Sequence, residues 1–381
     1  MKALFLAALL SAVAPMARAE PCCATGDLGL VVERATGSLL VIDRSDRAAL
    51  GRIEGLGDLS HASITYSPDE RYAYVFGRDG GLSKVDMLTR AVVARTIQAG
   101  NSIGGAISDD GRLIAVSNYE PGGVKVFDAD TLALVGDIPG SSKTIGLVDV
   151  PGRRFVWSTW ESGEALMADF SGPQMVVTKL GDVGKNPFDA VLTDDGHTYL
   201  IGLFGEKGVT AIDLWDDVPV PVRFLQDYGR SPDLPVYKMP HLQGWAFTEG
   251  KFVLPAVGAH ELLWVDRSTL QEVARTPMHG QPVFIIAQPG SPYVWVNFAT
   301  PLNDTVQVVD SRTHQVVRTL TPGKAVLHME FAPRGAEVWV SLRDDGKVVV
   351  YDTRSFEVLA EVPSKSPSGI FFTARAHRTG L

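Results

Sequence analysis

The sequence predicts an all-β protein that forms a single eight-bladed β-propeller. The first observation is a repeat: an apolar strand that ends in aspartate recurs at Asp43, Asp86, Asp128, Asp169, Asp213, Asp266, Asp310 and Asp352. These aspartates follow one another at intervals of 41 to 53 residues, and a period of about 40–50 residues made of four short strands is typical of a propeller blade. The second observation is that no window shows sustained periodicity of about 3.6 residues, which excludes solenoids of helical repeats.

The stretch from Asp58 to Asp86 shows one repeat unit in full. It reads as strand, turn, strand, turn, strand, and its apolar alternation is interrupted by Ser67-Pro68-Asp69 and by Gly77-Arg78-Asp79-Gly80-Gly81. Proline, glycine and aspartate at such positions favour tight turns between antiparallel strands. We therefore expect each unit to form one blade.

Eight innermost strands can be identified, one for each blade. They are expected to begin near His61, Ser102, Thr144, Phe188, His241, Val283, His328 and Ser368. The last of them has no downstream partner strands, whereas the first strands of the chain, Leu28 to Glu33 and Ser38 to Asp43, lack an inner strand. Pairing the two ends of the chain would complete an eighth blade and remove the exposed sheet edges that invite aggregation.

The N-terminal residues have the features of a secretory signal peptide. A short positive end and an apolar run are followed by Ala17-Arg18-Ala19, which predicts cleavage after Ala19 and export to the periplasm. The expected organisation is a signal peptide at 1–19, an N-terminal tail at 20–27, the propeller at 28–374 and a C-terminal tail at 375–381. No apolar stretch is long enough to span a bilayer, so stable membrane insertion is not expected.

Charge and cysteine content narrow the range of functions. The net charge is −9, which argues against a nucleic-acid partner. The two cysteines, Cys22 and Cys23, are adjacent and belong to no Cys-x-x-Cys-His or zinc-type pattern. A covalently attached c-type haem is therefore not expected. The sequence leaves open whether either cysteine is modified.

Propeller geometry sorts the loops into two faces. The first turn of each blade, such as Asp194-Asp195-Gly196, has generic turn chemistry and is expected on a structural face. The other face, where the inner strands start and the second turns lie, gathers His61, His241, His279, His328, Arg78, Tyr119, Trp160, Phe204, His260 and Arg343. Imidazole can ligate iron, guanidinium pairs with carboxylates, and aromatic rings can flank a ring plane. This mixture would suit a flat, anionic ligand that contains a metal.

Each of these residues also has a purely structural interpretation. A histidine at a strand start is more often hydrogen-bonded than metal-bound, Arg78 could be ion-paired with Asp79, and Trp160 and Trp245 could be core aromatics. A long insertion from Pro219 to Met239 is expected near the same face, either as a lid or as a rim without a chemical role. Only the convergence of several candidates on one face favours a ligand site.

Several of these motifs resemble a known family. Leu59-Ser60-His61-Ala62, followed by Gly77-Arg78-Asp79-Gly80-Gly81, is similar to the haem d1-binding propeller of the cytochrome cd1 nitrite reductases. The resemblance implies that His61 is the axial ligand of the haem iron and that Arg78 belongs to the basic ring around the carboxylates of the macrocycle. Tyr119, in Ala-Val-Ser-Asn-Tyr-Glu-Pro, resembles the tyrosine that contacts one of these carboxylates.

Other motifs resemble a branch of the same superfamily that serves haem d1 biosynthesis in the periplasm. These motifs lie at 183–189, 202–206, 237–242 and 254–258. The reductases carry two histidines that protonate nitrite-derived oxygen; His279 roughly matches one of them, whereas the other position falls near Phe298-Ala299. Because a site that lacks one proton donor is poorly suited to reducing nitrite, the resemblance favours a maturation role.

The resemblance implies a protein that binds haem d1, or a late tetrapyrrole precursor of it, non-covalently. His61 would ligate the iron, and His241 and His279 would face the open side of the macrocycle as acid–base groups. The residues implied in holding the carboxylates are Arg78, Tyr119 and Lys185.

The implied role is a late maturation step, either redox chemistry or modification of a side chain of the tetrapyrrole. Expected partners are other d1 maturation proteins or nitrite reductase. One alternative is a carrier that holds the tetrapyrrole and passes it on without catalysis. Another, from a different class, is a propeller scaffold or a lactonase-like enzyme, because propellers host many functions.

Overall fold

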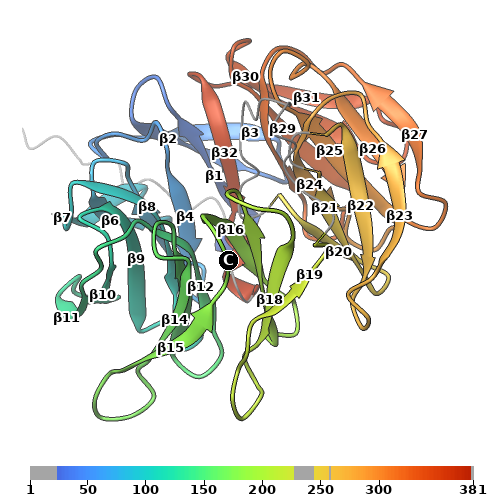
Figure 1. The fold of residues 1–381 in the computed structure, drawn as a ribbon. Helices are drawn as coiled ribbons and strands as arrows, with labels where there is room; N and C mark the ends of the chain where they lie inside the picture. Colours follow the sequence, from blue (N-terminus) through green and yellow to red (C-terminus); the bar gives the residue numbers. More distant parts are fainter. Residues whose placement is uncertain (1–23, 227–243, 257–258, 379–381) are drawn as a thin grey trace, which may run out of the picture.

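The computed structural model describes residues 24–226, 244–256 and 259–378. In these ranges the chain forms thirty-two β-strands in eight four-stranded sheets. The sheets follow one another around a ring, which is the arrangement of an eight-bladed propeller (Figure 1). The fold predicted from the sequence is confirmed.

We name the blades A to H in chain order and give the strands of each from the inside of the ring outward. Blades A to D are formed by β32 (Pro367–Phe372), β1 (Leu28–Glu33), β2 (Ser38–Asp43) and β3 (Ala48–Ile53); β4 (Ser63–Tyr66), β5 (Tyr72–Phe76), β6 (Gly81–Asp86) and β7 (Ala91–Ile97); β8 (Asn101–Ile107), β9 (Leu113–Glu120), β10 (Val124–Asp128) and β11 (Leu134–Ile138); and β12 (Thr144–Val150), β13 (Arg154–Thr159), β14 (Glu164–Asp169) and β15 (Val176–Asp182). Blades E to H are formed by β16 (Pro187–Leu192), β17 (Thr198–Leu203), β18 (Val209–Asp213) and β19 (Val222–Phe224); β20 (Ala246–Thr248), β21 (Lys251–Pro255), β22 (Glu261–Asp266) and β23 (Glu272–Pro277); β24 (Pro282–Ala287), β25 (Tyr293–Phe298), β26 (Val306–Asp310) and β27 (Gln315–Leu320); and β28 (Val326–Phe331), β29 (Glu337–Leu342), β30 (Lys347–Asp352) and β31 (Val358–Pro363).

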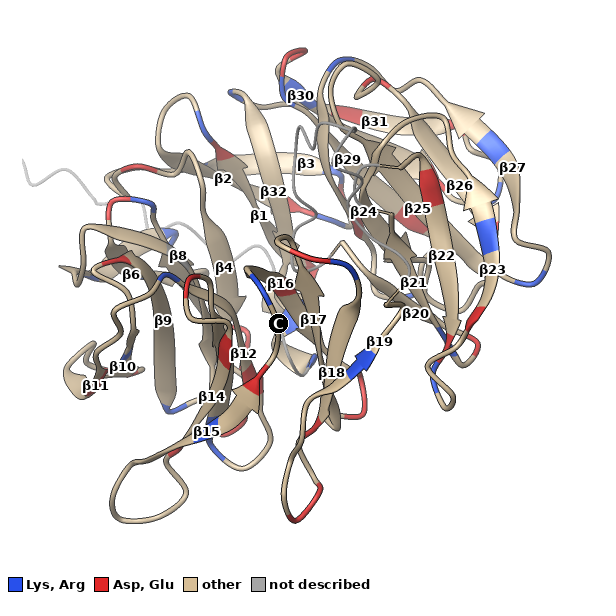
Figure 2. Ribbon diagram, in the orientation of Figure 1, with Lys and Arg blue, Asp and Glu red and all other residues tan. Residues whose placement is uncertain are grey.

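The hydrophobic core lies between neighbouring blades. Eight buried apolar clusters each combine side chains of two adjacent blades, and together they run around the whole ring. Three tryptophans in these clusters, Trp264, Trp295 and Trp339, are completely buried. Most charged residues lie instead in turns and at strand ends (Figure 2). This burial explains why the middle strands of the blades read as short, continuous apolar runs in the sequence.

The aspartate that ends each repeat has a structural role. All eight of these aspartates accept at least one backbone N–H from the turn that follows. Asp86, for example, accepts the N–H groups of Leu88 and Thr89 at 2.9 and 3.1 Å. A carboxylate that caps its own turn in this way fixes the return of the chain into the outer strand.

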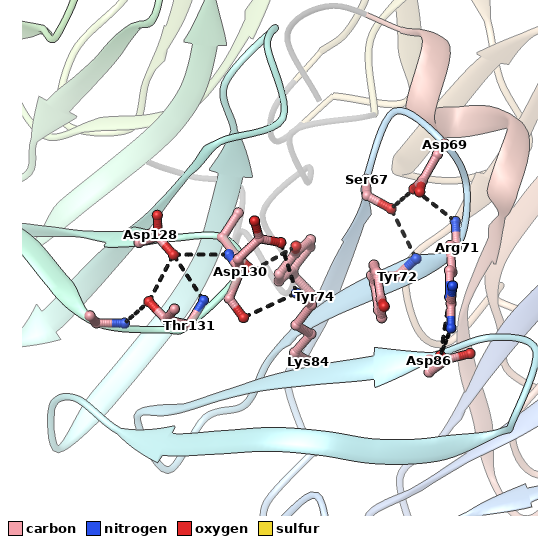
Figure 3. A network of polar contacts seen from close by, with 12 residues as sticks. Ser67, Asp69, Arg71, Tyr72, Tyr74, Lys84, Asp86, Asp128, Asp130 and Thr131 are labelled. Atoms are coloured by element: carbon pink, nitrogen blue, oxygen red, sulfur yellow. Dashed lines mark hydrogen bonds and ion pairs between the residues drawn. The ribbon is translucent and has the colours of Figure 1, made fainter.

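The inner strands begin on one face of the ring and end on the other. The face where they end, which we call the opposite face, carries the first turns of the blades and is stabilised by local contacts. In blade B the hydroxyl of Ser67 donates to Asp69 at 2.5 Å and shapes the turn between β4 and β5. Lys84 donates to the backbone carbonyl of Asp130 in blade C at 3.1 Å, so that a polar network joins the two blades (Figure 3). These contacts agree with the structural role that the sequence predicts for this face.

The two ends of the chain close the ring, as the sequence predicts. β32 pairs with β1 in antiparallel register, with Leu30 opposite Phe371, and the two strands lie side by side in Figure 1. The hydroxyl of Tyr66, at the end of β4, donates to the carbonyl of Phe371 at 2.7 Å. Blade A is therefore bonded within itself across both ends of the chain and is also tied to blade B.

Two short 3-10 helices flank the closing strands. η1 (Thr25–Asp27) precedes β1, and η2 (Thr373–His377) follows β32. The sequence predicted a tail from residue 375, whereas the structure continues η2 to His377, whose ring lies 2.7 Å from Glu70. None of the helices in the described part of the chain is long and apolar enough to cross a membrane.

Blades E and F depart from the predicted strand positions. The inner strand of blade F begins at Ala246 rather than near His241, which lies outside the described residues. The predicted insertion from Pro219 to Met239 contains the outer strand of blade E, β19, and its residues from 227 onward lie outside the described ranges. The sequence pattern missed β19 because only three residues form this strand.

A buried ion pair fixes the C-terminal end of the chain on the opposite face. The guanidinium of Arg375 in η2 donates to both carboxylate oxygens of Glu330 in β28, at 3.0 and 2.8 Å. The two side chains are only 5% and 4% exposed. Burial alone would raise the pKa of Glu330, but the charge and hydrogen bonds of Arg375 outweigh it and hold the pKa below its ordinary value.

Replacing Arg375 by leucine should lower the free energy of unfolding by about 3–5 kcal/mol, because it leaves a buried carboxylate without its partner. The deficit should be present near neutral pH. It should shrink as the pH falls through the lowered pKa of Glu330, because the wild-type carboxylate then takes up a proton and loses its advantage. Urea unfolding followed by tryptophan fluorescence at several pH values measures both effects.

The matched control is Arg312→Leu. Arg312 pairs with Asp310 at 2.7 Å, but its side chain is 59% exposed, so this substitution should cost less than about 1 kcal/mol. Equal losses in the two variants would contradict the role given to the buried pair.

Candidate functional site

The candidate site lies on the face where the inner strands begin, which we call the start face. In each blade this face also carries the turn between the second and third strands, because antiparallel strands return the chain to it. The residues predicted as site candidates come from these two kinds of segment. Neighbouring blades therefore place side chains from the same position of the repeat next to one another.

His61 lies in the segment 54–62, just before β4 begins at Ser63. This segment is fixed by packing, because the side chains of Leu56 and Leu59 are buried in the apolar cluster between blades A and B. The backbone carbonyl of Asp58 accepts the N–H of Arg78 at 2.8 Å and joins the segment to the next turn. His61 itself is half-buried. Its imidazole is thus held at the start of an inner strand by a well-packed loop.

Three neighbouring blades each contribute one arginine to the start face. Arg343, Arg34 and Arg78 lie in the second turns of blades H, A and B. Burial lowers the pKa of Arg34, and the positive charges of Arg343 and Arg78 lower it further, while Asp58 offsets part of the effect. Arg343 and Arg78 are therefore each close enough to repel Arg34, and we call the three residues the arginine cluster.

Within the described residues neither Arg34 nor Arg78 forms a salt bridge, although Asp58 lies near enough to both to offset part of their charge. The structural interpretation of Arg78, an ion pair with Asp79, is wrong, because Asp79 pairs with Arg95 at 2.7 Å. Arg343 does pair with a residue of its own turn, Asp344, at 2.6 Å. Two positive charges of the cluster are thus available to an anion.

Tyr119 continues this series in blade C. It stands near the end of β9 and is half-buried. Burial raises the pKa of its hydroxyl, the negative charge of Asp189 raises it further, and Arg78 acts in the other direction. The hydroxyl therefore keeps its proton and can donate a hydrogen bond. Asp189, a buried residue of β16 with a φ of 55°, was not among the sequence candidates.

Aromatic side chains occupy the start face of blades D and E. Trp160 lies in the second turn of blade D, and its ring centroid is 5.7 Å from that of Phe188 and 5.6 Å from that of Phe204. The side-chain amide of Asn186 donates to the carbonyl of Trp160 at 3.1 Å. Trp160 is half-buried, so it is packed against its neighbours and still reaches the surface.

Lys185 lies beside this aromatic group and is exposed. Its backbone N–H donates to the carboxylate of Glu206 at 2.8 Å, and its carbonyl accepts the N–H of Gly205 at 3.0 Å. The backbone is thus tied to the second turn of blade E, which leaves the long side chain on the surface of the start face.

The predicted acid–base histidines are placed unequally. His279 is exposed on the rim of blade G. Its backbone N–H donates to the side-chain oxygen of Gln307 at 2.9 Å, and its ring centroid lies 5.8 Å from that of Phe298. The position where the resemblance to the reductases would place a second histidine falls near Phe298-Ala299. His241 lies outside the described residues.

His328 follows the structural interpretation of a histidine near a strand start. It is 5% exposed, and its Nδ1 atom accepts the N–H of Ile370 at 3.2 Å. Its ring stacks on Phe371 and meets the edge of Phe284, with centroids 5.8 and 5.2 Å apart. His328 therefore helps to join blade H to the closing strand.

The start face therefore has a cationic side in blades H, A and B and an aromatic side in blades D and E, with Tyr119 between them. Such an arrangement can bind a flat molecule through its anionic edge. Among the residues that the structure describes, no three His, Cys, Asp or Glu side chains converge as ligands for a metal ion. Arg34 was missed in the sequence, although it follows β1 just as Arg78 follows β5, and aligning the second turns of the blades would have found it.

Comparison with known proteins gives consistent matches over nearly the whole chain. A family model described as the Cytochrome D1 heme domain matches residues 23–376. Two curated relatives are each called Protein NirF. The one from Stutzerimonas stutzeri is 52% identical over 372 residues, 95% of each chain, and the one from Pseudomonas aeruginosa is 51% identical over 98% of each chain.

More distant relatives share the fold. A dihydro-heme d1 dehydrogenase of Pseudomonas aeruginosa is 28% identical over 90% of this chain and 70% of its own length. A solved structure of the dihydro-heme d1 dehydrogenase NirN in complex with DHE matches with a TM-score of 0.81 at 25% identity, over 95% of this chain and 78% of that one. The Citrobacter koseri protein AztD has a TM-score of 0.65 at 13% identity, over 90% of this chain and 96% of its own, and shows the fold alone. Because the family model covers most of the sequence and half of the residues are identical in relatives of similar length, the chain belongs to the cytochrome d1 haem domain family.

Proposed function

We propose that this protein binds haem d1, or a late tetrapyrrole precursor of it, non-covalently on the start face and acts in a late step of haem d1 biosynthesis. The observation that carries the proposal is the arginine cluster beside His61. Arg34 and Arg78 form no salt bridge among the described residues, and Asp58 offsets only part of their charge, so the carboxylates of a macrocycle would supply further anions. Membership of the family, and the NirF relatives in particular, support the same ligand.

The residues of the start face fit such a group. The imidazole of His61 is the proposed iron ligand, since a half-buried histidine on a packed loop offers a nitrogen donor in a fixed position. The guanidinium groups of Arg34 and Arg78 would hold carboxylates through charge-assisted hydrogen bonds. Tyr119 would donate its hydroxyl proton to another carboxylate, and Lys185 would add an exposed positive charge.

A bound iron tetrapyrrole supplies a redox-active metal and a conjugated ring. The protein would contribute a proton donor or acceptor, and His279 on the rim of the start face is the candidate in the described part of the chain. His241 keeps the same proposed role from the sequence alone.

A carrier is the second candidate function. His279 is exposed and meets Phe298 in a T-shaped contact, whereas acid–base residues usually act in a water-excluded site that shifts their pKa. As a carrier, the protein would hold the tetrapyrrole and pass it to another maturation protein or to nitrite reductase. Residues 1–19 would direct either version to the periplasm.

Addition of haem d1 to the purified protein should shift the visible bands of the ligand, and His61→Ala should change the shifted spectrum and weaken binding at least about tenfold. Loss of a residue that only hydrogen-bonds to a metal ligand typically lowers metal affinity about 10–100-fold. Loss of the ligand itself should lower the affinity by at least as much. A titration followed by absorbance measures both.

His197→Ala is the control, because His197 is exposed on the opposite face and stacks on Trp215 with centroids 5.2 Å apart. This variant should bind as the wild type does. An unchanged spectrum in His61→Ala would exclude His61 as the ligand, and the absence of any shift with the wild type would exclude the tetrapyrrole.

Arg34→Gln and Arg78→Gln should each weaken haem d1 binding about 10- to 150-fold. A hydrogen bond to a charged group contributes about 1.5–3 kcal/mol, and about 1.4 kcal/mol corresponds to a factor of ten. Wild-type affinity should also fall as salt is added, and the variants should show a weaker salt dependence.

The control here is Arg267→Gln. Arg267 pairs with Asp194 and Asp195 at 2.9 and 2.6 Å on the opposite face, so its loss should leave binding unchanged. Wild-type affinity in both start-face variants would show that the arginine cluster does not hold the ligand.

His279→Gln separates the enzyme from the carrier. A late tetrapyrrole precursor of haem d1 serves as the substrate, and its conversion is followed by chromatography. In an enzyme, the variant should bind this tetrapyrrole normally but convert it at least about 100-fold more slowly, which is the usual contribution of a general acid or base. Conversion by His279→Gln at the wild-type rate would remove His279 from the chemistry, and no conversion by the wild type would favour the carrier.

A further inference from the structure

We propose that Glu33 is a positioning residue for the ligand site, so that closure of the propeller ring and binding on the start face are thermodynamically coupled. This inference rests on the proposed function, because it concerns how the arginine cluster is held in place. A continuous set of contacts runs from the seam between the chain ends to the segment that carries His61.

Glu33 is the central contact of that seam on the start face. Its carboxylate is completely buried. One oxygen accepts the hydroxyl of Ser364 at 3.2 Å and the N–H of Lys365 at 2.8 Å, both from the loop that leads into β32. Arg52 donates to both oxygens, at 2.8 and 3.1 Å, and Ser38 donates to one at 2.9 Å. Two of these five hydrogen bonds join the N-terminal strands of blade A to the C-terminal part of the chain, and the other three lie within the N-terminal strands.

The turn that follows Glu33 carries Arg34 and is bonded to the same seam. The N–H of Arg34 donates to the carbonyl of Ser366 at 3.2 Å. Within the turn, the hydroxyl of Thr36 lies 2.6 Å from that of Ser38, which in turn donates to Glu33. Arg34 therefore keeps its place only while the C-terminal loop stays docked against β1.

The same turn touches the loop that carries His61. Gly37 has a φ of 61°, and a Cβ atom there would collide with the backbone carbonyl of Gly57. Gly57 has a φ of 78° and lies against the side chains of Asp79 and Arg95. Each of four segments thus contacts the next: the seam, the turn at 34–37, the segment 54–62 and the turn at 77–81.

Electrostatic interactions connect these contacts to the binding of an anionic ligand. Arg343 and Arg78 repel Arg34, and Asp58 offsets part of that repulsion. The hydrogen bonds between Glu33 and the C-terminal loop help to hold the turn at 34–37 in place. An anionic ligand removes the repulsion. A ligand that binds better when the seam is closed must stabilise the closed seam by the same free energy.

The first test compares two buried carboxylates that both secure the C-terminal end. Glu33→Gln removes the charge next to the arginine cluster, whereas Glu330→Gln removes the charge that pairs with Arg375 on the opposite face. Both variants should be less stable than the wild type. Only Glu33→Gln should weaken haem d1 binding, by about 10- to 100-fold, which is typical for loss of a group that orients a ligand-binding residue.

A double-mutant cycle distinguishes positioning from a general loss of stability. In an Arg34→Gln background, Glu33→Gln should have little further effect on affinity, because the side chain that it positions is already gone. Should Glu33→Gln fail to fold, Arg52→Gln takes its place, since Arg52 makes two of the five hydrogen bonds and its side chain is 35% exposed. Full additivity of the two losses would overturn the positioning role.

Hydrogen exchange measures the coupling from the other side. Haem d1 should slow amide exchange at least about tenfold at Arg34 and Lys365, whose N–H groups donate across the seam. The amides of η2 on the opposite face should exchange at unchanged rates. Absence of ligand binding by the wild type would contradict the proposed function, whereas normal binding without slower exchange at the seam would contradict only the coupling.

Discussion

Closure of a ring is the constraint on which the rest of this structure depends. Each apolar cluster needs two blades to bury it, so a chain with one blade incomplete would expose the clusters on both of its sides. The protein meets this requirement with β32, which adds the inner strand to a blade whose other three strands come from the N-terminus. Two buried carboxylates secure the arrangement, Glu33 on the start face and Glu330 on the opposite face. These two carboxylates lie on opposite faces. Glu330 supports the fold alone, whereas Glu33 also adjoins the candidate site.

The repeat then determines what kind of site the fold can build. Equivalent turns of successive blades come together on the start face. Different residues at one position of the repeat therefore give this face a chemistry that changes from one side to the other. Arginine in three neighbouring blades gives the cationic side, and the aromatic cluster around Trp160 gives the other. The opposite face uses its equivalent turns for self-contained capping by serine, threonine and aspartate, as at Ser67 and Thr193. The difference in chemistry between the two faces therefore comes from side chains on a common backbone plan.

The sequence predicted those features that depend on local pattern. The spacing of the aspartates predicted the blades, because each aspartate caps its own turn, and the alternation of strands predicted which face His61 and Arg78 share. Features that depend on distant partners were not visible. The sequence places Arg375 in a tail because its partner Glu330 lies 45 residues away. The pattern includes His328 among the site candidates because it does not show that Phe371 stacks on the His328 ring. Arg34 was overlooked because its blade combines strands from both ends of the chain and so does not appear as one repeat.

The central claim is that one face of this propeller holds a d1-type tetrapyrrole between His61 and the arginine cluster. The most direct measurement is a crystal structure of the protein with haem d1 bound. The account predicts a macrocycle on the start face, with its iron within bonding distance of the His61 imidazole and its carboxylates against Arg34 and Arg78. A macrocycle bound on the opposite face, or on the start face with its iron away from His61 and its carboxylates away from both arginines, would contradict the account.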